Sequence, residues 1–176
     1  PFDRERKMAT VMVEVEDGEL ASFTHGAPEV LLEHVDSMLD DDARAKPLGA
    51  SERGDLTRTI EDLARVGLRV IALATRSLDA LARGGDRASW IAMTERHMTL
   101  IGLVGIADPP RPEVAEAIAR ARGAGVSTVM ITGDHPLTGE ATAREIGMLE
   151  ADGLVMTGPE VDRLSGVFAW WDGRTI

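Results

Sequence analysis

The sequence contains no cysteine and no tyrosine, and its aromatic residues are three phenylalanines and three tryptophans. Without cysteine, disulfide bonds and thiolate metal sites are excluded, which fits a reducing compartment. Because aromatic residues are so scarce, few side chains are available to stack on a planar ligand.

The chain also lacks long apolar runs and any excess of positive charge. A membrane-spanning helix needs about 20 consecutive apolar residues, and the longest run, around residues 100–107, is far shorter. The first five residues lack the apolar core of a signal peptide. The net charge of −11 argues against a nucleic-acid backbone as the main partner, because its phosphates would be repelled. A small basic cluster at Arg4, Arg6 and Lys7 is still available to a nucleotide.

A length of 176 residues and a hydrophobic fraction of 44% indicate one or two small domains with a real core. Alternating or strongly apolar segments predict four strands, at residues 8–16, 19–24, 68–75 and 98–107. Asp17-Gly18 is a hairpin-turn signal between the first two. The apolar spacing from Ala27 to Leu39 predicts a helix, with Pro28 near its start.

The pattern changes after the proline-rich stretch at residues 109–112, which we expect to be a hinge between two domains. Two helices are predicted at residues 113–122 and 136–146, alternating with strands at residues 126–131 and 154–156. This alternation is typical of an open parallel sheet covered by helices. The expected fold class is therefore α/β, with an antiparallel sheet and helices in residues 1–106 and a partial parallel domain in residues 107–176.

The most informative segment is Thr132-Gly133-Asp134, at the junction of a predicted strand and helix. Ligands of open α/β sheets bind at the carboxyl ends of strands. A hydroxyl group and the free N–H groups of a helix start suit a phosphoryl group there. Gly133 allows close approach of the backbone, and Asp134 suits a Mg²⁺-bound water. The alternative is that Asp134 only caps the next helix while Thr132 closes a turn.

Six short strings occur in an order and at spacings that match one family. They are Arg6-Lys7-Met8, His25-Gly26-Ala27-Pro28-Glu29, Gly67-Leu68-Arg69-Val70, Asp108-Pro109-Pro110-Arg111, Met130 to Leu137 and Thr157-Gly158-Pro159-Glu160. With them the sequence resembles the P-type cation-transporting ATPases, specifically the calcium-pump-like branch. The similarity covers roughly residues 2–169.

This resemblance implies that residues 1–106 are the C-terminal portion of a nucleotide-binding (N) domain. Residues 107–176 would be part of a haloacid-dehalogenase-like phosphorylation (P) domain. The implied cofactors are ATP and Mg²⁺, and no residue is implied as a dedicated metal ligand. The implied site residues are Phe2 stacking on adenine, His25 and Gly26 lining the nucleotide pocket, Arg69 contacting the ATP phosphates, Asp108 and Arg111 at the hinge, and the catalytic loop Thr132, Gly133 and Asp134 receiving the γ-phosphate and Mg²⁺.

Structural alternatives stand beside each of these roles. Phe2 could instead belong to the core, Gly26 to a plain helix-entry turn, and Arg69 to a structural ion pair. Asp108 and Arg111 could be solvated charges in a linker. His25 departs from the family, which has a lysine at this position, so a charge that depends on pH replaces a permanent one. Asp40-Asp41-Asp42 is expected to be a solvated loop, because adjacent carboxylates rarely converge on a metal.

The family's cycle also needs a phosphate-accepting aspartate in a DKTG string and a later GDGxND string, and neither occurs here. We therefore expect the chain to position Mg-ATP without turning it over alone. Its expected partners are adenine nucleotide and the remaining cytoplasmic and transmembrane parts of a pump, at the cytoplasmic face of a membrane. Two other functions stay open: a non-catalytic nucleotide sensor, and a capped haloacid-dehalogenase-type phosphatase. The latter would need a DxD string on its first strand, which is missing. The transported ion cannot be read from these residues.

Overall fold

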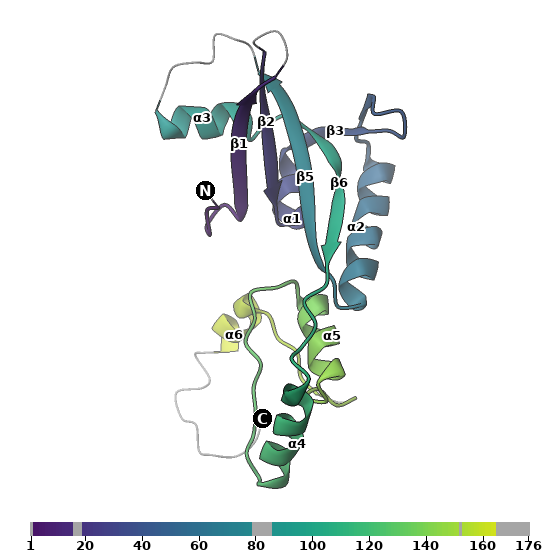
Figure 1. Ribbon diagram of the computed structural model, residues 1–176, viewed down its shortest axis with the longest axis vertical. Coiled ribbons are helices and arrows are strands. Elements are labelled where there is room, and N and C mark those ends of the chain that lie inside the picture. Colours follow the sequence, from purple (N-terminus) through teal and green to yellow (C-terminus); the bar gives the residue numbers. More distant parts are fainter. Residues whose placement is uncertain (1, 16–18, 79–85, 152, 165–176) are drawn as a thin grey trace. The chain divides into compact units, whose positions relative to one another are not determined.

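The computed structural model describes residues 2–15, 19–78, 86–151 and 153–164. The chain divides into two compact units (Figure 1). The first unit consists of residues 1–64 and 68–107, and the second contains residues 65–67 and the described residues from 108 onward. The expected turn at Asp17-Gly18 lies outside the described residues.

A six-stranded sheet forms the first unit, in the order β1-β2-β5-β6-β3-β4. Its strands are β1 (Met8–Glu14), β2 (Leu20–Gly26), β3 (Val35–Leu39), β4 (Ala45–Pro47), β5 (Arg69–Leu78) and β6 (Met98–Ile106). Neighbouring strands are antiparallel except β3 and β6, which run parallel. The four strands predicted from sequence are thus confirmed as β1, β2, β5 and β6. The structure adds β3 and β4.

The helix predicted from Ala27 to Leu39 is wrong in its second half. A short α1 (Pro28–Leu31) and a 3₁₀ turn, η2 (Leu32–His34), are followed by β3. Val35 is fully buried and pairs with Met98 of β6. An apolar spacing of three and four residues did not distinguish a long helix from a helix followed directly by a strand. Burial of Val35 in the sheet decides between them.

Two longer helices belong to the same unit, α2 (Ala50–Arg65) and α3 (Arg87–Thr94). Gly67 follows α2 with a φ of +81°, the left-handed conformation that commonly ends a helix. The sequence pattern did not predict α3. The Asp86 carboxylate caps it by accepting the Ser89 N–H at 2.9 Å. This bond holds the pKa of Asp86 below its ordinary value.

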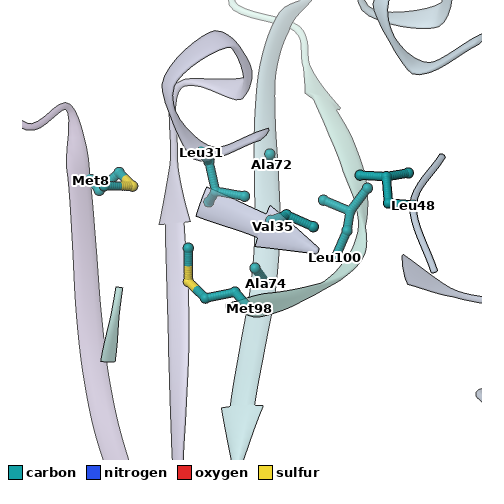
Figure 2. Close-up of a cluster of buried hydrophobic side chains, with 8 residues drawn as sticks. All are labelled: Met8, Leu31, Val35, Leu48, Ala72, Ala74, Met98 and Leu100. Atoms are coloured by element: carbon teal, nitrogen blue, oxygen red, sulfur yellow. The ribbon is translucent and has the colours of Figure 1, made fainter. Parts of the chain in front are cut away.

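Large side chains meet small ones in the core of the first unit. The cluster comprises Met8, Leu31, Val35, Leu48, Ala72, Ala74, Met98 and Leu100 (Figure 2). Leu31 and Val35 lie over β5 next to Ala72 and Ala74, all four almost completely buried. Alanines at the centre of the sheet leave the room that α1 and β3 occupy. One face of the sheet is filled in this way.

The second unit contains α4 (Glu113–Gly123), α5 (Pro136–Glu145) and α6 (Gly158–Leu164). The predicted helices 113–122 and 136–146 are confirmed, but residues 126–131 and 154–156 form no strand, so those two predictions are wrong. A strand of a parallel sheet needs a hydrogen-bonded neighbour and is buried on both faces. Within the described part of this unit nothing pairs with residues 126–131, and Val129 and Ile131 are 83% and 93% exposed. The mixed α/β class itself is confirmed.

Thr157 and Glu160, from the last of the matched strings, form half of a capping box at the start of α6. The Glu160 carboxylate accepts the Thr157 hydroxyl at 2.6 Å and the Thr157 N–H at 2.7 Å. The two bonds, the hydroxyl first, hold the pKa of Glu160 below its ordinary value. Since the pKa is depressed, their stabilising effect is present at neutral pH and is lost as pH falls through the folded-state pKa.

Replacing Leu100 by alanine tests the core. Leu100 is 1% exposed and its neighbour Ile101 is 41% exposed. We expect Leu100→Ala to lower the free energy of unfolding by about 2–5 kcal/mol, through lost burial and a residual cavity. The matched Ile101→Ala should cost under about 1 kcal/mol. Urea denaturation followed by circular dichroism measures both, and equal losses would contradict this assignment of the core.

Candidate functional site

The side of the sheet opposite the core is open. Cross-strand partners share a face, and successive residues of a strand alternate between faces. The pairs Val11–Phe23, His25–Leu73, Ile71–Val104 and Arg69–Ile106 therefore all lie on this side. We call these eight residues the open face. Val11 is 60% exposed, and Phe23, Val104 and Ile106 are between 41% and 43% exposed.

His25 and Arg69 lie on the open face together. His25 pairs with Ala9 on β1 and with Leu73 on β5. Arg69 lies four residues before Leu73 on the same strand, so it is about 13 Å from the row that contains His25. Both side chains are exposed. An imidazole and a guanidinium group thus lie on one largely apolar face of the sheet.

Phe2 lies at the β1 edge of the same sheet. Asp3 forms an antiparallel bridge with Met8, and the Asp3 N–H donates to the Met8 carbonyl at 3.0 Å. The bridge is isolated, so Phe2 lies one residue before the last paired position at the β1 edge of the sheet. The alternative role for Phe2 was a place in the core. Its side chain is 53% exposed, so it does not belong to the core.

Gly26 has a clear packing role. A Cβ atom built at this position would lie 2.5 Å from the Lys7 carbonyl oxygen and 2.7 Å from Cγ of Met8. The Ala27 N–H donates to the same carbonyl at 3.0 Å. A side chain at position 26 would therefore force the backbone at Lys7 to move. This packing accounts for the glycine without any ligand, and a contact with nucleotide stays a prediction.

The hinge candidates Asp108 and Arg111 lie in the second unit, between β6 and α4. Both are exposed, and the Arg111 carbonyl accepts the Val114 N–H at 3.0 Å as the chain turns into α4. Their exposure fits solvated linker charges as well as a hinge, and their contact with nucleotide also stays a prediction.

The loop Thr132-Gly133-Asp134 is closed on itself. The Thr132 Oγ1 accepts the Asp134 N–H at 3.1 Å and donates to the Asp134 carboxylate at 3.2 Å. At the start of α5, Nδ1 of His135 accepts the Leu137 N–H at 3.3 Å. A Cβ atom added at Gly133 would have no neighbouring atom within 4 Å. A hydroxyl, a carboxylate and a helix start therefore lie together on an exposed loop.

Other features of the described chain add no metal or membrane site. Among the described residues no three His, Asp or Glu side chains are grouped to hold a metal ion. Asp40 accepts the N–H groups of Asp42 and Arg44, at 3.0 and 2.9 Å, as a turn residue does. A pocket of about 270 Å³ lies beside Thr10, Trp90 and Glu95, and Thr10 belongs to the face opposite His25. None of the helices in the described ranges is long and apolar enough to cross a bilayer.

Comparison with known proteins identifies the family. Residues 1–113 match the family model described as P-type ATPase, cytoplasmic domain N. The chain belongs to the P-type ATPases. The match covers all of β1 to β6, including the open face.

Its relatives in this family are named as calcium pumps. The chain is 42% identical over 166 residues to the calcium-transporting ATPase of Bacillus subtilis, covering 94% of this chain and 18% of the relative. It is 39% identical to the endoplasmic reticulum calcium ATPase srcA of Aspergillus fumigatus, over 93% of this chain and 18% of the relative. The chain is 37% identical to the human plasma membrane calcium-transporting ATPase 4, and the match covers 93% of this chain and 13% of the relative. The chain thus spans less than a fifth of the length of these relatives.

Gly26→Ala separates packing from binding at this P-type ATPase motif. We expect a loss of about 1–3 kcal/mol in the free energy of unfolding, since the new methyl group meets the Lys7 backbone. The control is Gly102→Ala. Gly102 lies on β6 opposite Leu73, and a Cβ atom added there would have no neighbouring atom within 4 Å. This substitution should change the free energy of unfolding by about 0.5 kcal/mol or less. Thermal and urea unfolding measure both. An unchanged stability in Gly26→Ala would exclude the packing role.

Proposed function

We propose that this chain binds adenine nucleotide on the open face of its first unit, as the N domain of a calcium-transporting P-type ATPase. The observation that supports the proposal most is that His25 and Arg69 lie on one side of one sheet, while Phe2 is exposed next to the Asp3–Met8 bridge at the edge of β1. Membership of the family supports the binding of a nucleotide. The names of the relatives support calcium as the transported ion.

The open face suits the two chemically different ends of a nucleotide. The Phe2 ring supplies a stacking surface, a contact worth about 1–3 kcal/mol per base. Apolar neighbours such as Ile71 and Leu73 line the path toward Arg69, whose guanidinium group suits phosphate oxygens. An adenine stacked on Phe2, with its ribose and phosphates running past His25 toward Arg69, would use all three side chains.

The second unit carries the other residues of the proposal. We propose that Thr132, Gly133 and Asp134 accept the γ-phosphate and its Mg²⁺, with Asp108 and Arg111 as the hinge. The Thr132 hydroxyl and Asp134 carboxylate have the ligand chemistry that Mg²⁺ and a phosphoryl group need. When bound, Mg²⁺ would neutralise phosphate charge. The chain's own residues orient the nucleotide, while the acceptor aspartate and the membrane helices belong to the rest of the pump.

Calorimetric titration with ATP, ADP and GTP tests the nucleotide site. We expect ATP and ADP to bind more tightly than GTP, and Phe2→Ala to weaken ATP binding by about 1–3 kcal/mol because the stacking partner is lost. Phe23→Ala is the matched control, since Phe23 lies on the same face two residues from His25. ATP recovered after the titration should be intact, as expected for a chain without the acceptor aspartate. Equal affinity for GTP, or no effect of Phe2→Ala, would contradict adenine stacking.

His25 makes a second prediction, about pH. Phosphate charge favours a protonated imidazole, so proton uptake is linked to binding and ATP affinity should strengthen as pH falls from about 8 to about 5.5. The His25→Lys variant, which carries a permanent charge, should bind with little pH dependence over this range. His25→Ala provides the baseline for protonation of ATP itself. If wild type and His25→Ala show the same pH dependence, the imidazole has no electrostatic role in binding.

A further inference from the structure

A buried glutamate, Glu95, has both carboxylate oxygens occupied. Its side chain is 5% exposed. Oε1 accepts the Thr10 hydroxyl at 2.7 Å, and Oε2 accepts a hydrogen bond from Nη1 of Arg6. The Thr10 hydroxyl lies 3.0 Å from that of Thr24. A buried carboxylate is costly unless it is paired in this way.

Glu95 lies on the opposite side of the sheet from His25. Its N–H donates to the Ile91 carbonyl at 3.0 Å, so it is fixed at the end of α3. Thr10 alternates with Ala9 along β1, and Ala9 is the partner of His25. Glu95 therefore contacts the sheet from the core side, and a nucleotide on the open face would not touch it.

Arg6 links Glu95 to the segment that carries Phe2. The Asp3 carboxylate accepts the N–H groups of Glu5 and Arg6, at 3.0 and 3.1 Å, and its other oxygen lies 3.6 Å from Nε of Arg6. Residues 3–7 thus form a compact turn that ends at Lys7 with a φ of +50°. The hydrogen bond to Glu95 raises the pKa of Arg6 further above its ordinary value, so this arginine stays charged.

The Arg6–Glu95 pair joins this turn to the end of α3 beside a pocket. The pocket of about 270 Å³ described above is lined by Arg6, Thr10, Trp90 and Glu95, among others. Met12 and Ile91 also line this pocket, and the Arg6–Glu95 bond is the polar link between the turn and α3. Its loss would free the turn, and with it Phe2, while the apolar core remained in place.

We propose that Glu95 is a positioning residue for nucleotide binding: through Arg6 it fixes the turn that presents Phe2 on the open face. This inference rests on the proposed function. Glu95 acts from the core side of the sheet and makes no contact with the nucleotide.

A double-mutant cycle for ATP binding tests the proposal. Glu95→Gln keeps the shape of the side chain and removes its charge, and it should weaken ATP binding about five- to tenfold. In a Phe2→Ala background the same change should have almost no effect, because the group it positions is gone. Binding of inorganic triphosphate should be unaffected, since Arg69 and His25 remain. The matched control is Glu29→Gln. It removes the charge of an exposed carboxylate whose Oε1 lies 3.9 Å from Nζ of Lys7, the last residue of the turn, and it should not weaken binding.

Hydrogen exchange provides a readout that does not depend on nucleotide. In Glu95→Gln the amide of Asp3 should exchange faster while the β5 and β6 amides keep their protection. Arg6→Gln breaks the same pair from the other side and is the substitute if Glu95→Gln folds poorly. It should give the same weakening of ATP binding and the same faster exchange of the Asp3 amide. Wild type that binds no ATP overturns the proposed function together with this inference. Wild-type affinity in Glu95→Gln, or an equal loss with and without Phe2, overturns this inference alone.

Discussion

The packing of Leu31 and Val35 against Ala72 and Ala74 determines which side of the sheet is free. Two alanines at the centre of β5 let α1 and β3 lie close over it, and this packing closes one face. Strand alternation then places every second side chain of β1, β2, β5 and β6 on the other face. His25 and Arg69 lie on this open face because the residues next to them in sequence point to the core side.

The sequence predicted the parts of this sheet in which one local pattern has one structural meaning. Alternation and apolar runs identified β1, β2, β5 and β6. It did not identify β3, because the spacing of Val35 and its neighbours fits a helix as well as a strand. The choice depends on a parallel pairing with Met98, 63 residues later. Residues 126–131 show the reverse case: a strand pattern remains unpaired when no neighbour is present among the described residues.

The candidate site could be found as a set of residues but not as a geometry. The family resemblance predicted Phe2, His25 and Arg69, and the strand register shows that His25 and Arg69 share a face. The register also gives Gly26 a structural explanation that no string contains, since its missing Cβ makes room for the Lys7 carbonyl. A glycine inside a binding motif therefore does not indicate a ligand contact by itself, because close packing of backbone produces the same requirement.

Glu95 shows why some residues of a site cannot be read from sequence. It lies between a short helix and a strand, in a stretch where a charged residue ordinarily faces solvent. Its burial depends on Arg6 and Thr10, which precede it by more than 80 residues. The same Arg6 belongs to a basic cluster that composition alone would assign to a phosphate ligand, whereas the structure turns it toward the interior. In the proposal made above, Arg6 therefore contributes by holding Phe2 in place and not by direct contact of its charge with the ligand.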